Sequence, residues 1–243
     1  MQIKYITNVR IPTSRAQGYA ITKMCSEFAK AEAKVKLFVP KRINTDSNKS
    51  PFDFYKIEEN FEIKKVPSFD LLGKTFRFGR VFYWLDILSF LLISKFYVRP
   101  KSGDILYTRD FIAAMSFPSK NFVCLELHDI PTSKFLFKLA LKKPKLFFVL
   151  NKNIKSELVK MGVEKSKIHI FPCGVDIDQF NISISQEEAR KKIDLPLSKK
   201  IVLYSGQFYA WKGIDILAEA AKIMPETTFV FIVLAPENIV YSF

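Results

Sequence analysis

Short apolar segments that alternate with helical segments constrain the fold of this 243-residue chain more than any other feature. The strand-like runs lie at 3–9, 35–39, 61–66, 104–109, 121–127, 145–151 and 167–172. The helical patterns lie at 19–33, 78–97, shortly after Asp110, 133–142 and 152–161. Such alternation predicts an α/β fold with a Rossmann-like, doubly wound parallel sheet, which binds ligands beyond the carboxyl ends of its strands. Residues 41–60 are polar and interrupted by Pro51, so we expect one long loop there.

The alternation restarts at Lys200 after a polar segment. Apolar residues at 201–204 predict a buried parallel strand, Ser205-Gly206 predicts a turn, and 214–221 has a helical apolar face. A last strand is expected at 228–234. Two strands and one helix cannot bury both faces of a parallel sheet. We therefore expect this second Rossmann-like domain to be incomplete.

These patterns predict three parts. Residues 1–172 form an N-terminal domain, 173–199 form a linker, and 200–243 form the truncated start of a C-terminal domain. Within the linker, Ser185 and Glu188 have the spacing of a capping box and predict the start of a short helix.

Charge and motifs narrow the class of ligand. The formal net charge of +14 predicts an anionic partner. No G-x-G-x-x-G follows the first strand and no G-x-x-x-x-G-K-[ST] occurs, which argues against nicotinamide enzymes and P-loop nucleotidases. The three cysteines lie far apart and the chain has two histidines, so neither a disulfide framework nor a metal site is expected. We expect a reducing, cytoplasmic setting and see no signal peptide.

Residues 200–224 have the order strand, glycine turn and helix that commonly binds anions. Backbone N–H groups at a helix N-terminus and the helix dipole attract negative charge. Lys212 adds a positive charge immediately before Gly213. The alternative is an ordinary strand–helix unit with a solvated lysine.

A basic and aromatic region at 64–101 has two interpretations. It contains eight lysines and arginines and nine aromatic residues, and its apolar window 81–98 includes Asp86 and Lys95. These charges argue against a membrane-spanning helix. A helix that attaches peripherally to an anionic membrane surface fits this composition, and so does a core helix with a solvated basic edge. No nucleic-acid-binding module is found, so no nucleic-acid partner is expected.

Four segments resemble the family 4 glycosyltransferases, which are retaining enzymes with two Rossmann-like domains (the GT-B type). They are PTSRAQGYAITKMCSEFA at 12–29, DILYTRD and LELHDIP at 104–110 and 125–131, LNKNIKSELVKMGVEKSKIHIFPCGVDIDQF at 150–180, and LYSGQFYAWKGIDILAEAAK at 203–222. The last two are specific in combination. The resemblance implies transfer of a sugar from a nucleotide-diphosphate sugar to a sugar or lipid-linked acceptor, without a metal or cofactor.

The resemblance also assigns residues to roles. It places His128 near the transferred sugar as the catalytic candidate. It sets Gly18, Gly206, Gln207, Lys212 and Gly213 against the donor diphosphate, although the family commonly has arginine where Gln207 stands. The acceptor-side candidates are Arg15, Arg109 and Glu126. The alternatives are a histidine held by neighbouring carboxylates, a plain turn glycine at position 18, and a surface ion pair at Arg109.

The family's second domain continues through a glycine pair and a glutamate motif that holds the donor. Val233-Leu234 occupy the place of the glycine pair here, and no segment matches the glutamate motif. We therefore expect the chain to be inactive alone. The alternative function is a non-catalytic acceptor- or membrane-binding domain whose donor site is completed by a second chain, peripheral at the inner face of the membrane.

Overall fold

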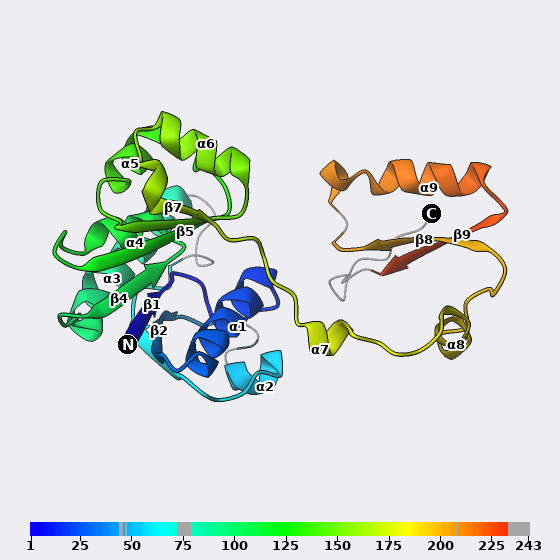
Figure 1. Ribbon diagram of the computed structural model, residues 1–243, viewed down its shortest axis with the longest axis horizontal. Coiled ribbons are helices and arrows are strands. Elements are labelled where there is room, and N and C mark those ends of the chain that lie inside the picture. Colours follow the sequence, from blue (N-terminus) through cyan, green and yellow to red (C-terminus); the bar gives the residue numbers. More distant parts are fainter. Residues whose placement is uncertain (44–45, 47, 72–78, 208, 233–243) are drawn as a thin grey trace. The chain divides into compact units, whose positions relative to one another are not determined.

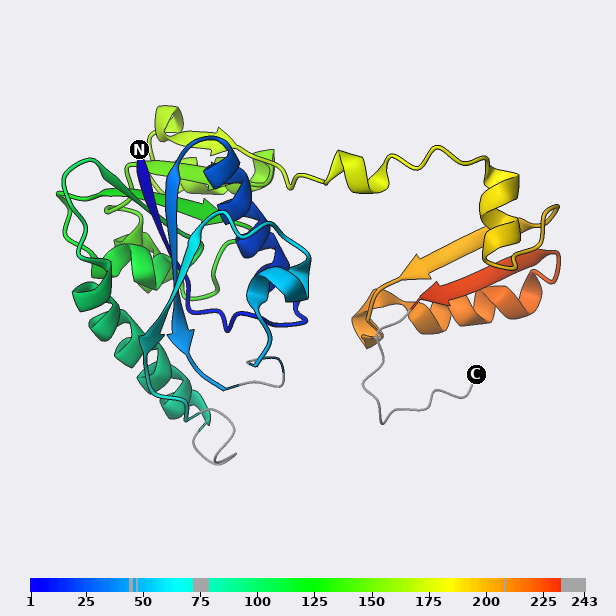
Figure 2. The same ribbon diagram turned by 90° about the horizontal axis from the view of Figure 1, so that it is seen from below.

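The computed structural model describes residues 1–43, 46, 48–71, 79–207 and 209–232 (Figure 1). The chain divides into two compact units, Met1–Gly174 and Val175–Phe243. Each unit is a separate α/β structure with its own parallel sheet (Figure 2).

The first unit contains a seven-stranded parallel sheet with the order β3-β2-β1-β4-β5-β6-β7. The strands are β1 Gln2–Ile6, β2 Lys34–Lys41, β3 Glu62–Pro67, β4 Asp104–Thr108, β5 Phe122–Leu127, β6 Leu146–Val149 and β7 Ile168–Ile170. β1 pairs with β2 on one side and with β4 on the other, so that Ile6 lies opposite both Phe38 and Thr108. The strand order reverses at this point, which makes the carboxyl ends of β1 and β4 the expected place for a ligand.

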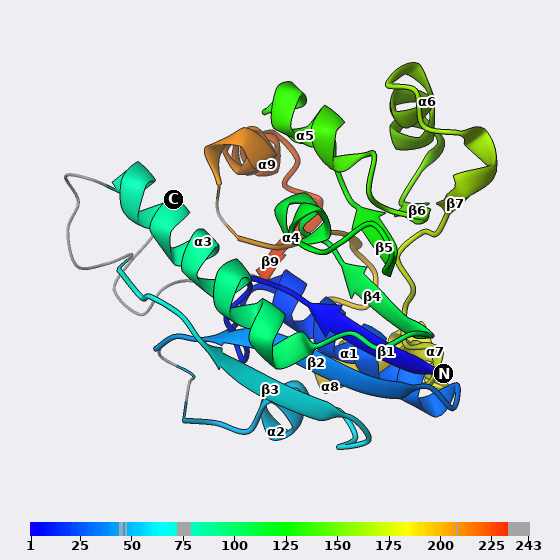
Figure 3. The same cartoon turned by 90° about the vertical axis from the view of Figure 1, so that its left-hand side faces the viewer.

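Helices cover both faces of this sheet (Figure 3). They are α1 Ala16–Lys30, α2 Pro51–Tyr55, α3 Gly79–Val98, α4 Phe111–Ser116, α5 Lys134–Ala140 and α6 Lys152–Lys160. Alternate residues of β1 point to opposite faces: Tyr5 packs with the α1 side and Ile6 with the α3 side. The α1 side includes Ile21 and Phe52, and the α3 side includes Phe90 and Phe137. The predicted doubly wound sheet is therefore confirmed.

The loop predicted at 41–60 is partly wrong, because α2 forms inside it. Pro51 is the first residue of this helix, where a missing N–H and a fixed φ do no harm. Phe52 is buried and packs edge-to-face on Phe61, with ring centroids 5.1 Å apart. Lys56 ends the helix in the left-handed conformation. Burial of Phe52 against Phe61 therefore stabilises a short helix within this polar segment.

Helix α3 packs one side against the sheet through Ile87, Phe90, Leu91 and Val98. Asp86 is fully buried on that side, and its carboxylate accepts a 3.0 Å hydrogen bond from the backbone N–H of Leu71. Val81–Val98 is long and apolar enough to cross a membrane, a test that core helices of soluble proteins also pass. One third of this window is buried inside the unit. Residues 72–78 of the predicted basic and aromatic region lie outside the described residues.

The second unit has a two-stranded parallel sheet of β8 Lys200–Ser205 and β9 Thr227–Ile232, with helices α7 Ile177–Phe180, α8 Gln186–Lys192 and α9 Ile214–Ile223. The capping box is confirmed: the Ser185 hydroxyl accepts from Glu188 N, and the Glu188 carboxylate accepts from Ser185 N. The expected burial of β8 is wrong, since Leu203 is 59% exposed. α9 is the helix that packs on this sheet in the part of the chain that is described. Positions 233 and 234 of the last predicted strand lie outside that part.

Candidate functional site

The first group of candidate residues lies at the carboxyl ends of β4 and β5. Arg109 follows the last residue of β4, Glu126 is the penultimate residue of β5, and His128 follows that strand. The parallel register sets Thr108 opposite Leu125, which brings these three side chains together at one edge of the sheet. Arg109, Glu126 and His128 therefore form a contiguous cluster, although Glu126 lies 17 positions after Arg109 in the chain.

Glu126 is the centre of this cluster. Its Oε1 atom accepts from Arg109 Nη2 and from His128 Nε2, each at 2.6 Å, and its Oε2 atom accepts from the Tyr107 hydroxyl at 2.8 Å. Burial by itself would raise the pKa of Glu126, but the hydrogen bonds from His128, Arg109 and Tyr107 outweigh burial and lower the pKa. Glu126 is thus an ionised carboxylate that holds two neighbouring side chains in place.

The exposure of the three side chains separates their possible roles. Glu126 has 3% of its side chain exposed, Arg109 has 17%, and His128 has 36%. An ionised carboxylate only accepts hydrogen bonds, so Nε2 of His128 carries the proton in this pair. A bound molecule would touch His128 and Arg109, with Glu126 behind them. The ion pair of Arg109 is largely buried, unlike the surface pair weighed from the sequence.

Two tyrosines and a cysteine form the buried floor behind the cluster. The rings of Tyr5 and Tyr107 pack in a tilted arrangement with their centroids 5.1 Å apart, and Cys25 is fully buried in the same cluster. Burial raises the pKa of Tyr5, of Tyr107 and of Cys25, so all three are neutral. The low-polarity floor strengthens the charged contacts of Glu126.

A pocket of about 620 Å³ opens at the carboxyl ends of β1 and β4. Arg15 and Arg109 both line it, so two of the three acceptor-side candidates are brought together. Thr7, Asn8 and Asp110 are further polar members of its wall. Its volume falls within the range of roughly 300–1,000 Å³ typical of small-molecule sites.

Gly18 lies in the first turn of α1, and the packing of Tyr55 accounts for the glycine. A Cβ atom at this position would stand 2.2 Å from the Tyr55 hydroxyl oxygen and 2.5 Å from Thr13 Cγ2. That hydroxyl accepts from Thr13 N at 2.8 Å and donates to Thr13 O at 2.9 Å. Gly18 therefore lets α2 fix the loop between β1 and α1. Its predicted contact with a donor diphosphate stays a prediction.

The second group of candidates gathers at the carboxyl end of β8. Gly206 N donates to Ile232 O at 3.0 Å, and a Cβ on Gly206 would stand 3.4 Å from Lys212 Nζ. Gly213 has φ 67° and caps α9 without a side-chain hydrogen bond. Gln207 is exposed in the same loop. Gly206, Gln207, Lys212 and Gly213 are thus brought together, in the second unit.

Lys212 is held by an aromatic ring. Its Nζ atom lies 5.3 Å from the centroid of the Trp211 ring, and Tyr209 stacks on that ring at 6.0 Å. Among the described residues, Lys212 makes no ion pair with a carboxylate, and its side chain instead lies over the Trp211 ring. A cation placed over a ring face and left without an anionic partner is suited to binding an anion.

No group of three or more histidine, cysteine, aspartate or glutamate side chains that could hold a metal occurs in the described ranges. Metal-independent chemistry stays a prediction.

Three residues of the site are not identified by the sequence patterns. Tyr107 belongs to the cluster around Glu126, and Arg10 and Arg42 line the pocket. Tyr107 precedes Arg109 by two residues, so the alternation of side chains along a strand is the signal that places both on the same face of the sheet.

Comparisons with known proteins agree with the fold. No family model matches the chain. It is 30% identical over 76 residues to a D-inositol 3-phosphate glycosyltransferase of Xylanimonas cellulosilytica, a match covering 29% of this chain and 18% of the relative. Sucrose-phosphate synthase from Thermosynechococcus elongatus matches with a TM-score of 0.69 and 17% identity, over 98% of this chain and 64% of the synthase. Anabaena HepE in complex with UDP-glucose matches with a TM-score of 0.58 and 14% identity, over 95% of this chain and 60% of HepE.

These similarities establish the fold class. The α/β architecture with its parallel seven-stranded sheet is that of the Rossmann-like GT-B glycosyltransferases. The chain spans less than two thirds of the length of either solved neighbour.

Proposed function

We propose that the chain is part of a family 4-like, retaining glycosyltransferase that uses a nucleotide-diphosphate sugar. The observation that carries this proposal is the position of Lys212, beside Gly206 and directly before the helix N-terminus of α9. The loop offers a cation and backbone N–H groups to an anion, as a diphosphate leaving group requires. The complex of HepE with UDP-glucose supports a nucleotide sugar as the donor.

The first unit would hold the acceptor. In the proposed reaction the bond between the sugar C1 and the diphosphate oxygen breaks, C1 bonds to the acceptor hydroxyl oxygen on the same face, and the hydroxyl proton passes to the departing diphosphate oxygen. The diphosphate leaves with the bonding electrons and is stabilised by Lys212. His128 would lie near the transferred sugar, its ring held through Nε2 by Glu126. The acceptor class, a sugar or a lipid-linked sugar, is part of the proposal.

The test is turnover in a chimera that joins residues 1–232 to the remaining part of a GT-B neighbour's nucleotide-sugar domain. Uridine, guanosine and adenosine diphosphate sugars are offered with sugar and lipid-linked acceptors, and product configuration is read by NMR. Transfer with retention is expected for one donor. Hydrolysis or epimerisation without transfer in a folded chimera would contradict the proposal.

A second candidate function rests on the outer face of α3. Its apolar side chains Trp84, Leu88, Leu92 and Phe96 are 37–71% exposed, and Lys95 is exposed among them. Exposed apolar residues beside lysines are typical of helices that lie in a membrane interface. In this alternative the chain attaches an acceptor-binding unit to the inner face of the membrane, and a second chain completes the donor site. Vesicle binding without any transfer by the chimera would favour it.

A further inference from the structure

Four arginines surround the pocket at the carboxyl ends of β1 and β4. They are Arg10, Arg15, Arg42 and Arg109, and Asp110 is the acidic residue in the described wall. Arg10 and Arg15 come from the segment between β1 and α1, Arg42 follows β2, and Arg109 follows β4. Four separate positions of the chain thus bring guanidinium groups to one concave surface.

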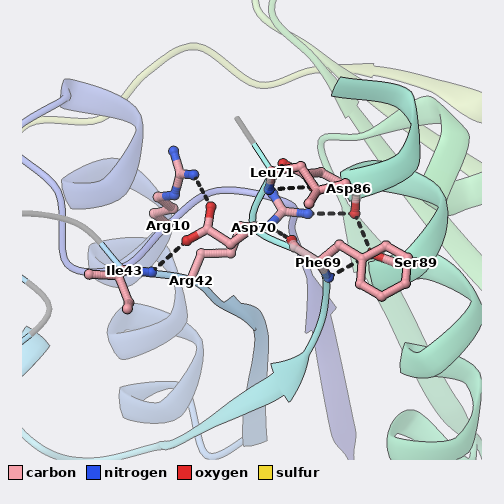
Figure 4. A network of polar contacts seen from close by, with 8 residues as sticks. All are labelled: Arg10, Arg42, Ile43, Phe69, Asp70, Leu71, Asp86 and Ser89. Atoms are coloured by element: carbon pink, nitrogen blue, oxygen red, sulfur yellow. Dashed lines mark hydrogen bonds and ion pairs between the residues drawn. The ribbon is translucent and has the colours of Figure 1, made fainter. Parts of the chain in front are cut away.

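Two of these arginines are held in position by the segment 69–71, which follows β3. Figure 4 shows Arg10 and Arg42 on either side of Asp70. Arg10 Nη2 pairs with Asp70 Oδ1 at 2.5 Å. Arg42 donates from Nε to Phe69 O at 3.0 Å and from Nη2 to Asp86 O at 2.5 Å. These contacts fix both guanidinium groups before any ligand binds.

Carboxylates already balance three of the four arginines: Arg10 pairs with Asp70, Arg109 pairs with Glu126, and Asp86 and Asp70 lie near Arg42, which leaves Arg15. The Asp110 carboxylate caps α4 by accepting from Ile112 N and Ala113 N, and burial raises its pKa. Burial lowers the pKa of Arg42, the nearby Arg10 charge lowers it further, and Asp86 and Asp70 act in the opposite direction. No carboxylate in the described part of the chain pairs with the exposed Arg15.

Two donors beside the pocket also lack partners. The Nε atoms of Arg10 and Arg109 are buried and make no hydrogen bond to the described residues. Buried donors without partners are costly, and an anion that enters the site could relieve that cost. Guanidinium groups bind phosphate and carboxylate oxygens in a planar, bidentate manner.

We propose that this pocket binds the anionic group, a phosphate or a carboxylate, of a phosphorylated or acidic sugar acceptor. That the bound molecule is a sugar acceptor rests on the proposed function. That it carries a negative charge rests on the arginines alone. Arg15 and Arg42 contact the anion, and Arg109 contributes charge from beside Glu126. Thr7, Asn8 and Thr13 provide polar groups for sugar hydroxyls in the same wall.

The test is calorimetric titration of the whole chain with glucose 6-phosphate, glucuronate and glucose. The two anions are expected to bind and neutral glucose to bind at least tenfold more weakly. Arg15→Gln and Arg42→Gln should each weaken glucose 6-phosphate binding about tenfold or more, since contacts to charged groups are the stronger hydrogen bonds. Arg99→Gln is the matched control, because Arg99 is exposed and is absent from the pocket wall, and it should change nothing.

A phosphate group could also bind in the Lys212 loop, which is proposed to hold the donor diphosphate. The Lys212→Ala variant distinguishes that loop from the arginine pocket. Binding of glucose 6-phosphate that survives Lys212→Ala and is lost in Arg15→Gln supports the proposal. Binding that is lost in Lys212→Ala and kept in Arg15→Gln overturns it and leaves the proposed function standing. Equal binding of glucose and glucose 6-phosphate, or equal loss in Arg99→Gln, also overturns it. Anion binding through Arg15 in a folded chimera that transfers no sugar would instead contradict the proposed function.

Discussion

Arg109 and Glu126 form a charged hydrogen bond of 2.6 Å between neighbouring strand ends, with Glu126 only 2% exposed. His128 donates to the same carboxylate oxygen. One buried carboxylate therefore orients an arginine in the pocket wall and the histidine proposed to lie near the transferred sugar.

Glu126→Gln should destabilise the first unit. Removing one member of a buried ion pair leaves the other charge uncompensated and costs about 3 kcal/mol. Chemical denaturation followed by Trp84 fluorescence, in a Trp211→Phe background, measures the change. Glu157→Gln is the control, because Glu157 pairs with Lys160 on an exposed helix surface and should have a much smaller effect. Equal midpoints for the two variants would contradict the assignment of Glu126 as the anchor.

The same carboxylate predicts a pH dependence of stability. The pKa of Glu126 is lowered in the folded protein. Its contribution is therefore fully present above the unfolded pKa of about 4.3, and it is lost as the pH falls through the folded value. The difference in unfolding free energy between the parent and Glu126→Gln should shrink as the pH falls below about 4. A difference that stays constant down to low pH would show that the carboxylate charge does not matter.

Gly18→Ala should destabilise the first unit through a clash. The added Cβ would meet the Tyr55 hydroxyl and Thr13 Cγ2 at 2.2 and 2.5 Å. Overpacking of this kind costs roughly 1–3 kcal/mol. Tyr55→Phe removes the clashing oxygen, so the double variant should be less destabilised than the sum of the two single variants. Additive effects in thermal unfolding would exclude this contact as the reason for the glycine.

Lys212→Ala should lower turnover of an active chimera by roughly one to two decades, since it removes a charge-assisted contact with the leaving diphosphate. Gln207→Arg should leave turnover unchanged or raise it, because it adds a second positive charge facing the same anion. Parental activity of Lys212→Ala would refute the phosphate assignment of this loop.

Residues 1–243, without the segment that the chimera adds, are expected to bind nucleotide sugars weakly. Micromolar binding in a calorimetric titration would contradict that expectation.

Attachment to vesicles should depend on both charge and the outer face of α3. Binding to anionic vesicles should fall as salt rises, because screening acts over about 8 Å at physiological ionic strength. Leu92→Glu should weaken it further, since Leu92 is 58% exposed and its loss leaves the core intact. Ile193→Glu, at a 66% exposed position of the second unit, serves as the control. Equal sedimentation with neutral and anionic vesicles would mean that the basic residues are merely solvated.

The sequence predicts the strands and helices of the first unit well, because their patterns are local. The capping box of Ser185 and Glu188 is predicted for the same reason. Two errors come from burial, which depends on distant parts of the chain: α2 forms where Phe52 reaches Phe61, and Leu203 is exposed although its run is apolar.

The site was predictable only in part. The candidates follow strand ends and glycine turns, which sequence patterns reveal. Their contacts depend on the register between β4 and β5, which no local pattern encodes. Arg42 comes from a third strand end and is aimed by backbone carbonyls of Phe69 and Asp86, so only the folded chain identifies it as part of the pocket.

The buried carboxylate of Asp86 gives α3 a fixed inner side. Rotation of the helix about its axis would break the hydrogen bond between the N–H group of Leu71 and the Asp86 carboxylate. Tyr83 and Ile87 consequently remain in the pocket wall, while Leu88 and Leu92 of adjacent turns remain outside. An α-helix is about 10 Å across with its side chains. The arginine-lined pocket and the exposed apolar face of α3 therefore lie on two sides of the same helix, separated only by its thickness.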